Sequence, residues 1–161
     1  MPIFKSFRGG RPHPDLIDTF PTQSLDNLSQ EEIQKKSLEE NTYINMLKPA
    51  VVSKSKDVDR NLRKVRSTYE ELVEDKKLLQ DISSYYLYEQ IMPDKFSFRG
   101  LLGLVSVEDF FNGKIKKHES TIPERRLKMA YYLEKVNLQA EPVLLTYNAN
   151  AKVELLMNHE Q

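Results

Sequence analysis

The sequence contains no cysteine in its 161 residues. This absence excludes disulfides, thiolate nucleophiles and zinc–thiolate sites, and it is typical of proteins from a reducing compartment. No apolar run approaches the roughly 20 residues that a membrane span needs, and the N-terminus lacks a signal-peptide pattern. Lysine plus arginine and aspartate plus glutamate both total 24, so the chain lacks the charge excess of general nucleic-acid or membrane-surface binders. We therefore expect a cytoplasmic protein whose partners include neither a membrane nor a nucleic acid.

The composition that remains is that of a folded domain. Hydrophobic residues make up 39% of the chain and charged residues 30%, which is polar for a globular protein but outside the disordered range. A domain of this length buries roughly 70% of the surface of its unfolded chain. Strands that alternate with helices predict an α/β or α+β fold with a mixed sheet and flanking helices. We expect one domain over residues 1–161.

The expected elements follow from apolar periodicity and from capping signals. Helices are expected at 29–40, 56–79, 108–111 and 121–136, the first and last of them opened by a capping box. Strands are expected at 2–8, 43–47, 84–91, 96–107 and 142–147. Residues 15–28 are expected to be irregular, and residues 151–157 to form a short helix or strand. The strands 84–91 and 96–107 should pair as an antiparallel hairpin at the centre of the sheet, and the apolar run of 96–107 predicts that this strand is buried on both faces.

One stretch, Gly113-Lys-Ile-Lys-Lys-His-Glu-Ser-Thr121, concentrates groups that bind anions or move protons, and we call it the basic segment. Lys116 and Lys117 are suited to neutralising phosphate oxygens. His118 titrates near neutral pH and suits a general acid or base, with Glu119 to orient or replace it. The spacing alone does not name a reaction.

Thr121 is expected at the N-cap of the helix that follows the basic segment. There it would bring the free N–H groups of the first helical turn close to a bound anion. The alternative is structural: the lysines form a solvated turn, His118 bonds a neighbouring carbonyl, and Thr121 only caps the helix. No metal site is predicted, because the remaining histidines show no ligand spacing.

A second candidate for anion binding lies near the N-terminus, where Arg8 and Arg11 flank two glycines. Glycine allows a close approach of backbone N–H groups to a ligand, and arginine binds phosphate or carboxylate through two parallel hydrogen bonds. Residues 9–14 are expected to turn rather than to continue a strand. A solvated turn without a ligand is the simpler interpretation of this stretch.

Five segments together resemble domain-of-unknown-function family 1015, in the same order and over almost the whole chain. They are Ile3–Pro12, Tyr85–Gln90, Gly103–Phe110, Gly113–Thr121 and Glu141–Leu145. The run Ile-Lys-Lys-His-Glu-x-Thr within the basic segment is the most specific of these matches. The family has no established activity as a class.

The resemblance implies a larger protein. Full-length family members are longer and carry an Asp-Gly-His-His-Arg motif that looks like the phosphate-handling signature of the ParB/sulfiredoxin-like group. That group includes a nucleotide-dependent kinase of free serine, and family members tend to accompany serine biosynthesis genes. This sequence lacks the motif, and only Glu124 precedes Arg125–Arg126 where the family often has several acidic residues. We therefore expect it to be the N-terminal portion of a longer family member.

Two functional hypotheses follow. The first is part of a small-molecule phosphotransferase, similar to a serine kinase, that binds a phosphorylated or nucleotide ligand, with ADP or ATP and magnesium as the cofactors the resemblance suggests. In it, His118 and Glu119 are catalytic, and the ligand is bound by Arg8, Arg11, Lys116, Lys117 and Thr121. The second is a non-catalytic binding or structural module. Substrate and oligomeric state stay open.

Overall fold

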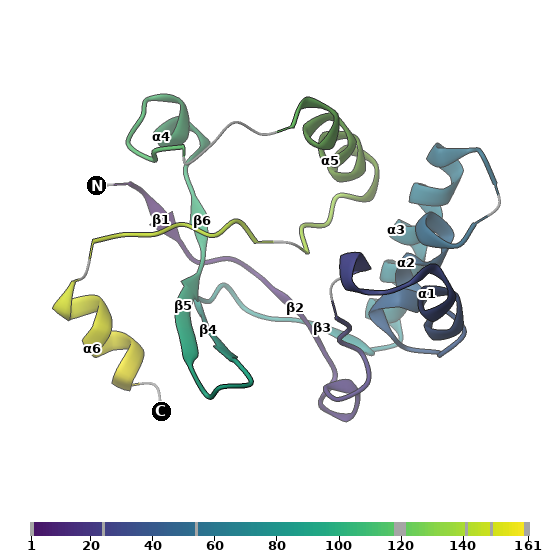
Figure 1. Cartoon of the computed structure of the whole chain (residues 1–161), viewed down its shortest axis with the longest axis horizontal. Helices are drawn as coiled ribbons and strands as arrows, with labels where there is room; N and C mark the ends of the chain where they lie inside the picture. Colours follow the sequence, from purple (N-terminus) through teal and green to yellow (C-terminus); the bar gives the residue numbers. More distant parts are fainter. Residues whose placement is uncertain are drawn as a thin grey trace. The chain divides into compact units, whose positions relative to one another are not determined.

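The computed structural model describes residues 2–23, 25–53, 55–117, 122–140, 142–148 and 150–159. Backbone contacts divide the chain into two compact units. The first unit comprises residues 1–9, 81–119 and 140–161, and the second comprises residues 10–80 and 120–139. Helices and antiparallel strands occur in both, so the predicted α+β class is confirmed (Figure 1). The prediction of one domain stays a prediction.

The second unit contains most of the helices. A capping box between Ser29 and Glu32 opens α1, as predicted, since each side chain accepts a hydrogen bond from the other residue's backbone N–H. The helices of this unit are α1 (Gln30–Lys36), α2 (Tyr43–Val51), α3 (Val58–Glu74) and α5 (Pro123–Val136), together with the short 3-10 helices η1 (Pro14–Leu16) and η2 (Leu25–Asn27). Its strands β2 (Gly10–Pro12) and β3 (Leu78–Gln80) pair antiparallel.

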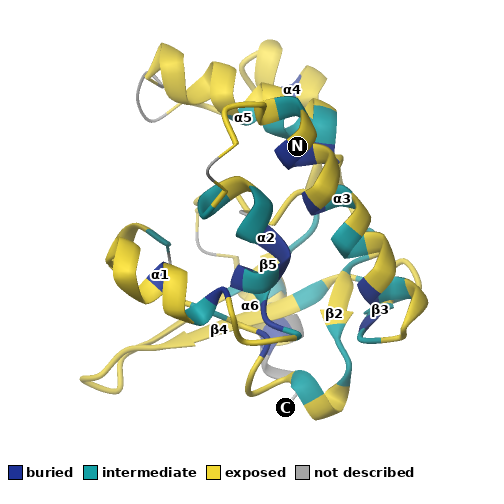
Figure 2. Ribbon diagram, turned by 90° about the vertical axis from the view of Figure 1, so that its right-hand side faces the viewer, coloured by how far each residue is buried: buried dark blue, intermediate teal, exposed yellow. Residues whose placement is uncertain are grey.

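The apolar core of the second unit lies on the buried face of α3. Val65 is fully buried there, and Val136 of α5 is fully buried in the same cluster. Apolar residues at helical spacing on α3 predicted this face. The other members of the cluster are Phe20, Met46, Leu47, Leu62, Leu72 and Leu78. Figure 2 shows the buried positions of α2 and α3 in dark blue.

The described part of the first unit contains two pairs of short strands and two helices. Strand β1 (Phe4–Lys5) pairs antiparallel with β6 (Leu104–Val105), and β4 (Tyr86–Ile91) pairs antiparallel with β5 (Ser97–Leu102). The helices are α4 (Val107–Phe111) and α6 (Ala151–His159). The predicted hairpin is therefore confirmed, with Tyr88 opposite Gly100 in its register.

Several expectations were wrong. Residues 43–47 form part of helix α2 rather than a strand, because the Thr42 side chain caps the first turn and the buried residues Ile44 and Leu47 are spaced three apart. Residues 10–12 do not turn but form β2, an edge strand that tolerates Pro12 at its end. The described strands form three two-stranded antiparallel sheets rather than one mixed sheet.

The apolar strands also proved less buried than expected. The hairpin is exposed along most of its length, as the yellow ribbon of β4 shows in Figure 2. Phe98 is 54% exposed, so the expected burial on both faces is wrong. Residues 142–148 form no strand, and Leu144 is 89% exposed. No helix within the described residues is both long enough and apolar enough to cross a membrane.

We predict that Val65→Ala lowers the free energy of unfolding by about 2 kcal/mol, because it removes buried methyl groups and leaves a cavity. Val58→Ala in the same helix should change it by less than about 0.5 kcal/mol, since Val58 is 55% exposed. Urea denaturation followed by circular dichroism measures both. Equal losses in the two variants would contradict the assignment of this helix face to the core.

Candidate functional site

The basic segment follows α4 directly, and the sequence of α4 determines how the segment begins. The Ser106 hydroxyl accepts a hydrogen bond from the Asp109 backbone N–H at 3.4 Å and so caps the helix start. At the other end, the Asn112 N–H bonds the Glu108 carbonyl, and Gly113 has a φ of +78°. Glycine adopts this left-handed conformation at little cost. The helix therefore ends sharply and the chain turns into the basic segment.

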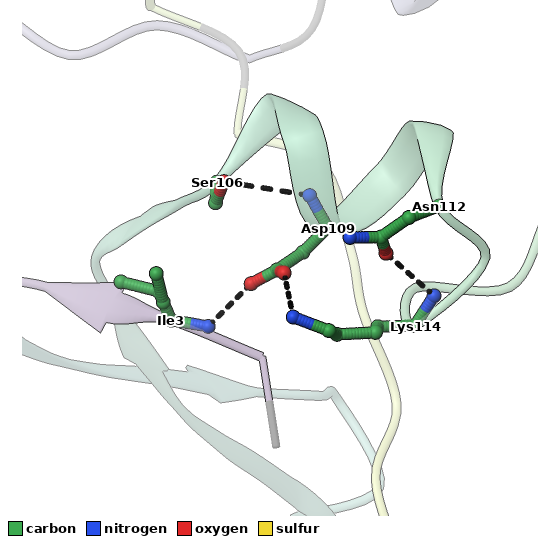
Figure 3. Close-up of polar contacts among 5 residues, drawn as sticks. All are labelled: Ile3, Ser106, Asp109, Asn112 and Lys114. Carbon is green, nitrogen blue, oxygen red and sulfur yellow. Dashed lines mark hydrogen bonds and ion pairs between the residues drawn. The ribbon is translucent and has the colours of Figure 1, made fainter.

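The Asp109 side chain connects several parts of the first unit. It is 2% exposed. One carboxylate oxygen accepts a hydrogen bond from the Ile3 backbone N–H at 2.7 Å, and the other accepts one from Lys114 Nζ at 2.7 Å (Figure 3). The Asp109 backbone carbonyl also accepts a hydrogen bond from the Ile115 N–H at 3.0 Å. One residue thus joins the N-terminal strand, α4 and the start of the basic segment.

The negative charge of the Asp109 carboxylate is stabilised by the groups that donate hydrogen bonds to it. The hydrogen bond from Lys114 and the one from the Ile3 N–H both lower the pKa of the carboxyl group, while burial acts in the opposite direction. The group is therefore ionised at neutral pH. Because a buried carboxylate is costly without a partner, the ammonium group of Lys114 is committed to Asp109.

The other lysines of the basic segment remain at the surface. Lys116 and Lys117 are both exposed. Lys117 Nζ lies 5.1 Å from the centre of the Phe110 ring, a cation–π contact that returns the segment towards α4. The two predicted catalytic residues, His118 and Glu119, lie outside the described residues.

Thr121, the predicted N-cap of the last predicted helix, also lies outside the described residues. Helix α5 has Ile122 at its N-cap position, without a side-chain capping hydrogen bond, and Pro123 as its first residue. Proline suits this position because its missing N–H would have no partner within the helix. Because Ile122 holds the N-cap position of α5, the expectation that Thr121 is the N-cap is wrong, whereas its role in ligand binding stays a prediction.

The two predicted arginines fall in different units. Arg8, in the first unit, is exposed, and its Nε donates a hydrogen bond to the Asp81 carbonyl at 3.3 Å. Arg11 lies in β2 of the second unit, opposite Leu79, and is also exposed. Their predicted role in ligand binding stays a prediction.

Gly9, which follows Arg8, is required by a close contact that the sequence did not reveal. The Gly9 N–H donates to the Tyr86 hydroxyl at 2.8 Å, and this hydroxyl donates to an Asp81 carboxylate oxygen at 2.9 Å. A Cβ atom on Gly9 would lie 2.5 Å from the Tyr86 oxygen. The close approach that glycine permits here is to a tyrosine ring.

Sequence reasoning missed Asp109 as a site residue. Ser106-x-x-Asp109 matches a capping box, in which the acidic side chain would bond back to the helix start. The carboxylate turns instead to Ile3 and Lys114. A carboxylate five residues before a lysine, across an Asn-Gly turn, is the one local signal for this contact. Among the described residues, no three histidine, aspartate or glutamate side chains gather closely enough to hold a metal ion.

The described chain is thus an α+β protein with a basic segment that a buried aspartate holds at its start. The model of a family described as protein of unknown function (DUF1015) matches residues 4–161, and the chain belongs to that family. The resemblance inferred from the five segments is therefore confirmed. No curated protein and no solved structure shows significant similarity to the chain.

We predict that Asp109→Asn lowers the melting temperature at neutral pH by about 5 °C, because the ion pair with Lys114 is lost. Because the pKa of Asp109 is lowered in the folded protein, its ionised carboxylate stabilises the fold. This stabilisation is complete above the usual carboxyl pKa of about 4 and is lost as the pH falls through the lowered pKa. The difference between wild type and variant should therefore shrink in acid. Glu108→Gln, on the same helix, is the control. A difference that is equal at pH 7 and in acid would contradict the ion pair.

We also predict that Gly9→Ala lowers the free energy of unfolding by about 1–2 kcal/mol, since the new methyl group overlaps the Tyr86 hydroxyl. The ring has little room to move, because it packs 4.9 Å from the Phe7 ring and bonds Asp81. Gly100→Ala has no atom within 4 Å of the new Cβ and should not destabilise the protein. Urea midpoints measure both; a harmless Gly9→Ala would refute the steric argument.

Proposed function

We propose that the basic segment binds a small phosphorylated or nucleotide ligand, and that the chain is part of a small-molecule phosphotransferase of the serine-kinase type. The observation that supports this proposal is that one lysine of the basic segment is paired internally while two others are exposed. Lys114 is committed to the buried Asp109, whereas Lys116 and Lys117 are exposed two and three residues further on. An anchored start reduces the entropy that the segment loses when it closes on a ligand.

In this proposal, Lys116 and Lys117 bind phosphate oxygens as mobile point charges. His118 and Glu119, which follow immediately, serve as the acid or base that moves a proton at the reacting oxygen. ADP or ATP are the nucleotides we propose. The described residues offer no cluster of three magnesium ligands, so we assign no protein ligand to that ion.

A non-catalytic binding or structural module is the second candidate. The exposed apolar residues of the first unit favour it, because large exposed apolar areas mark sites of protein contact. Ile91 is 69% exposed and Phe96 is 58% exposed, both at the end of the β4–β5 hairpin. A module of this kind would keep its fold but show no response to phosphorylated ligands.

A thermal-shift screen against inorganic phosphate, phosphoserine, ADP and ATP tests the proposal. A ligand at a hundred times its dissociation constant stabilises the fold by about 2.7 kcal/mol. We expect a shift in wild type that is lost in Lys116→Gln/Lys117→Gln and in His118→Ala/Glu119→Ala. Lys35→Gln/Lys36→Gln, a matched pair of neighbouring lysines at the end of α1, should keep it.

The absence of a shift for every ligand, with all proteins folded, would contradict ligand binding by the basic segment and favour the module. A shift that survives in Lys116→Gln/Lys117→Gln would place the ligand elsewhere on the chain.

A further inference from the structure

The second unit contains a cleft of about 290 Å³ that the described residues of the basic segment do not line. Its walls come from the end of β2, the turn before α2 and the C-terminal end of α3. The His13 N–H donates to the Lys77 carbonyl at 2.8 Å, which fixes two of these walls to each other. Leu16 also lines the cleft and packs against the apolar core. The cleft therefore rests on the apolar core of the second unit.

The wall at the end of α3 carries a lysine where a glycine would be favoured. The Lys77 N–H bonds the Leu72 carbonyl and the Lys76 N–H bonds the Val73 carbonyl, the pair of hydrogen bonds that closes a helix with a left-handed residue. Lys76 is that residue, with a φ of +59°. A lysine pays a steric penalty in this conformation that glycine does not. Lys76 is exposed and lines the cleft.

A second left-handed residue lines the same cleft. Asn41 has a φ of +57° and is half-buried. Neither its amide nor the Lys76 ammonium has a hydrogen-bond partner within the described part of the chain. Backbone conformations of this kind gather at ligand-binding sites, where the surrounding structure holds them. Two residues whose side-chain polar groups are unengaged thus line one cleft.

The remaining charges of the cleft are largely satisfied internally. Lys77 Nζ lies 3.2 Å from an Asp75 carboxylate oxygen, so these two charges offset each other. The Nδ1 atom of His13 accepts a hydrogen bond from the Asp15 backbone N–H at 3.3 Å. An Asp15 carboxylate oxygen lies 3.4 Å from the same Nδ1 atom, and because the Asp15 side chain is 86% exposed, it has room to accept a further hydrogen bond.

We propose that this cleft binds a small hydroxycarboxylate. Lys76 and Asn41 donate to the carboxylate of the ligand, and Asp15 accepts a hydrogen bond from its hydroxyl group. A charge-assisted hydrogen bond to Lys76 contributes most of the affinity, because ionised pairs are about twice as strong as neutral ones. The lining of the cleft shares no residue with the basic segment, so this proposal stands or falls independently of the proposed phosphotransferase.

The test is a two-dimensional ¹⁵N–¹H NMR titration of the protein with glycolate. We expect the amide signals of Asn41, Lys76 and Lys77 to move together, with a dissociation constant in the range of about 1–10 mM for so small a ligand. Propionate, which lacks the hydroxyl group, and ethylene glycol, which lacks the carboxylate, should bind more weakly. Unmoved cleft signals would overturn the proposal, and so would equal binding of propionate or tighter binding of inorganic phosphate.

Variants at the left-handed positions give opposite effects on stability and on binding. Lys76→Gly should raise the melting temperature by about 2–4 °C, because the steric penalty disappears, and weaken glycolate binding about tenfold. Lys95→Gly replaces another left-handed lysine, in the β4–β5 turn, and should raise stability without changing binding. Asn41→Gly should weaken binding as well. Unchanged glycolate binding in Lys76→Gly and Asn41→Gly would overturn the site.

Discussion

The buried carboxylate of Asp109 is the interaction on which the first unit depends. The second unit has an apolar core around α3, whereas Met157 is the one buried apolar residue among those described in the first unit. With so little apolar burial, the first unit relies on polar and aromatic contacts, such as the stacking of Phe4 on Tyr85. The Asp109 carboxylate is a buried member of these contacts, and its hydrogen bond to Ile3 joins residues that are 106 positions apart in the chain. It also determines where the basic segment starts.

This arrangement gives the neighbouring lysines different tasks. A lysine that pairs with a buried carboxylate cannot serve a ligand without leaving that carboxylate unpaired, so Lys114 is a structural residue. The exposed lysines that follow are free of that constraint. The same reasoning distinguishes the lysines of the cleft, where Lys77 pairs with Asp75 and Lys76 has no partner among the described residues. In both places one lysine forms an internal ion pair, and its neighbour is the one that we propose for ligand binding.

Local signals in the sequence predicted local structure well. The capping box at Ser29 and the apolar stripe of α3 act within one helix, and both predictions were confirmed. The side-chain composition led to a wrong prediction for residues 43–47. These residues favour a strand, but they lie in a helix that the Thr42 side chain caps. The contacts that assemble the candidate site join distant segments. Nothing near Asp109 indicates that its partner is the backbone of Ile3, so sequence reasoning found the lysines but not their anchor.

The most direct test of this account is a calorimetric titration of wild type and Asp109→Asn with ATP, at a temperature where both are folded. If the buried carboxylate holds the basic segment ready for a phosphorylated ligand, wild type binds ATP and the variant binds it several-fold more weakly. The loss should appear in the entropy of binding, since the released segment must be ordered by the ligand. Equal affinities, or no binding by wild type, would contradict the link between Asp109 and the function of the basic segment.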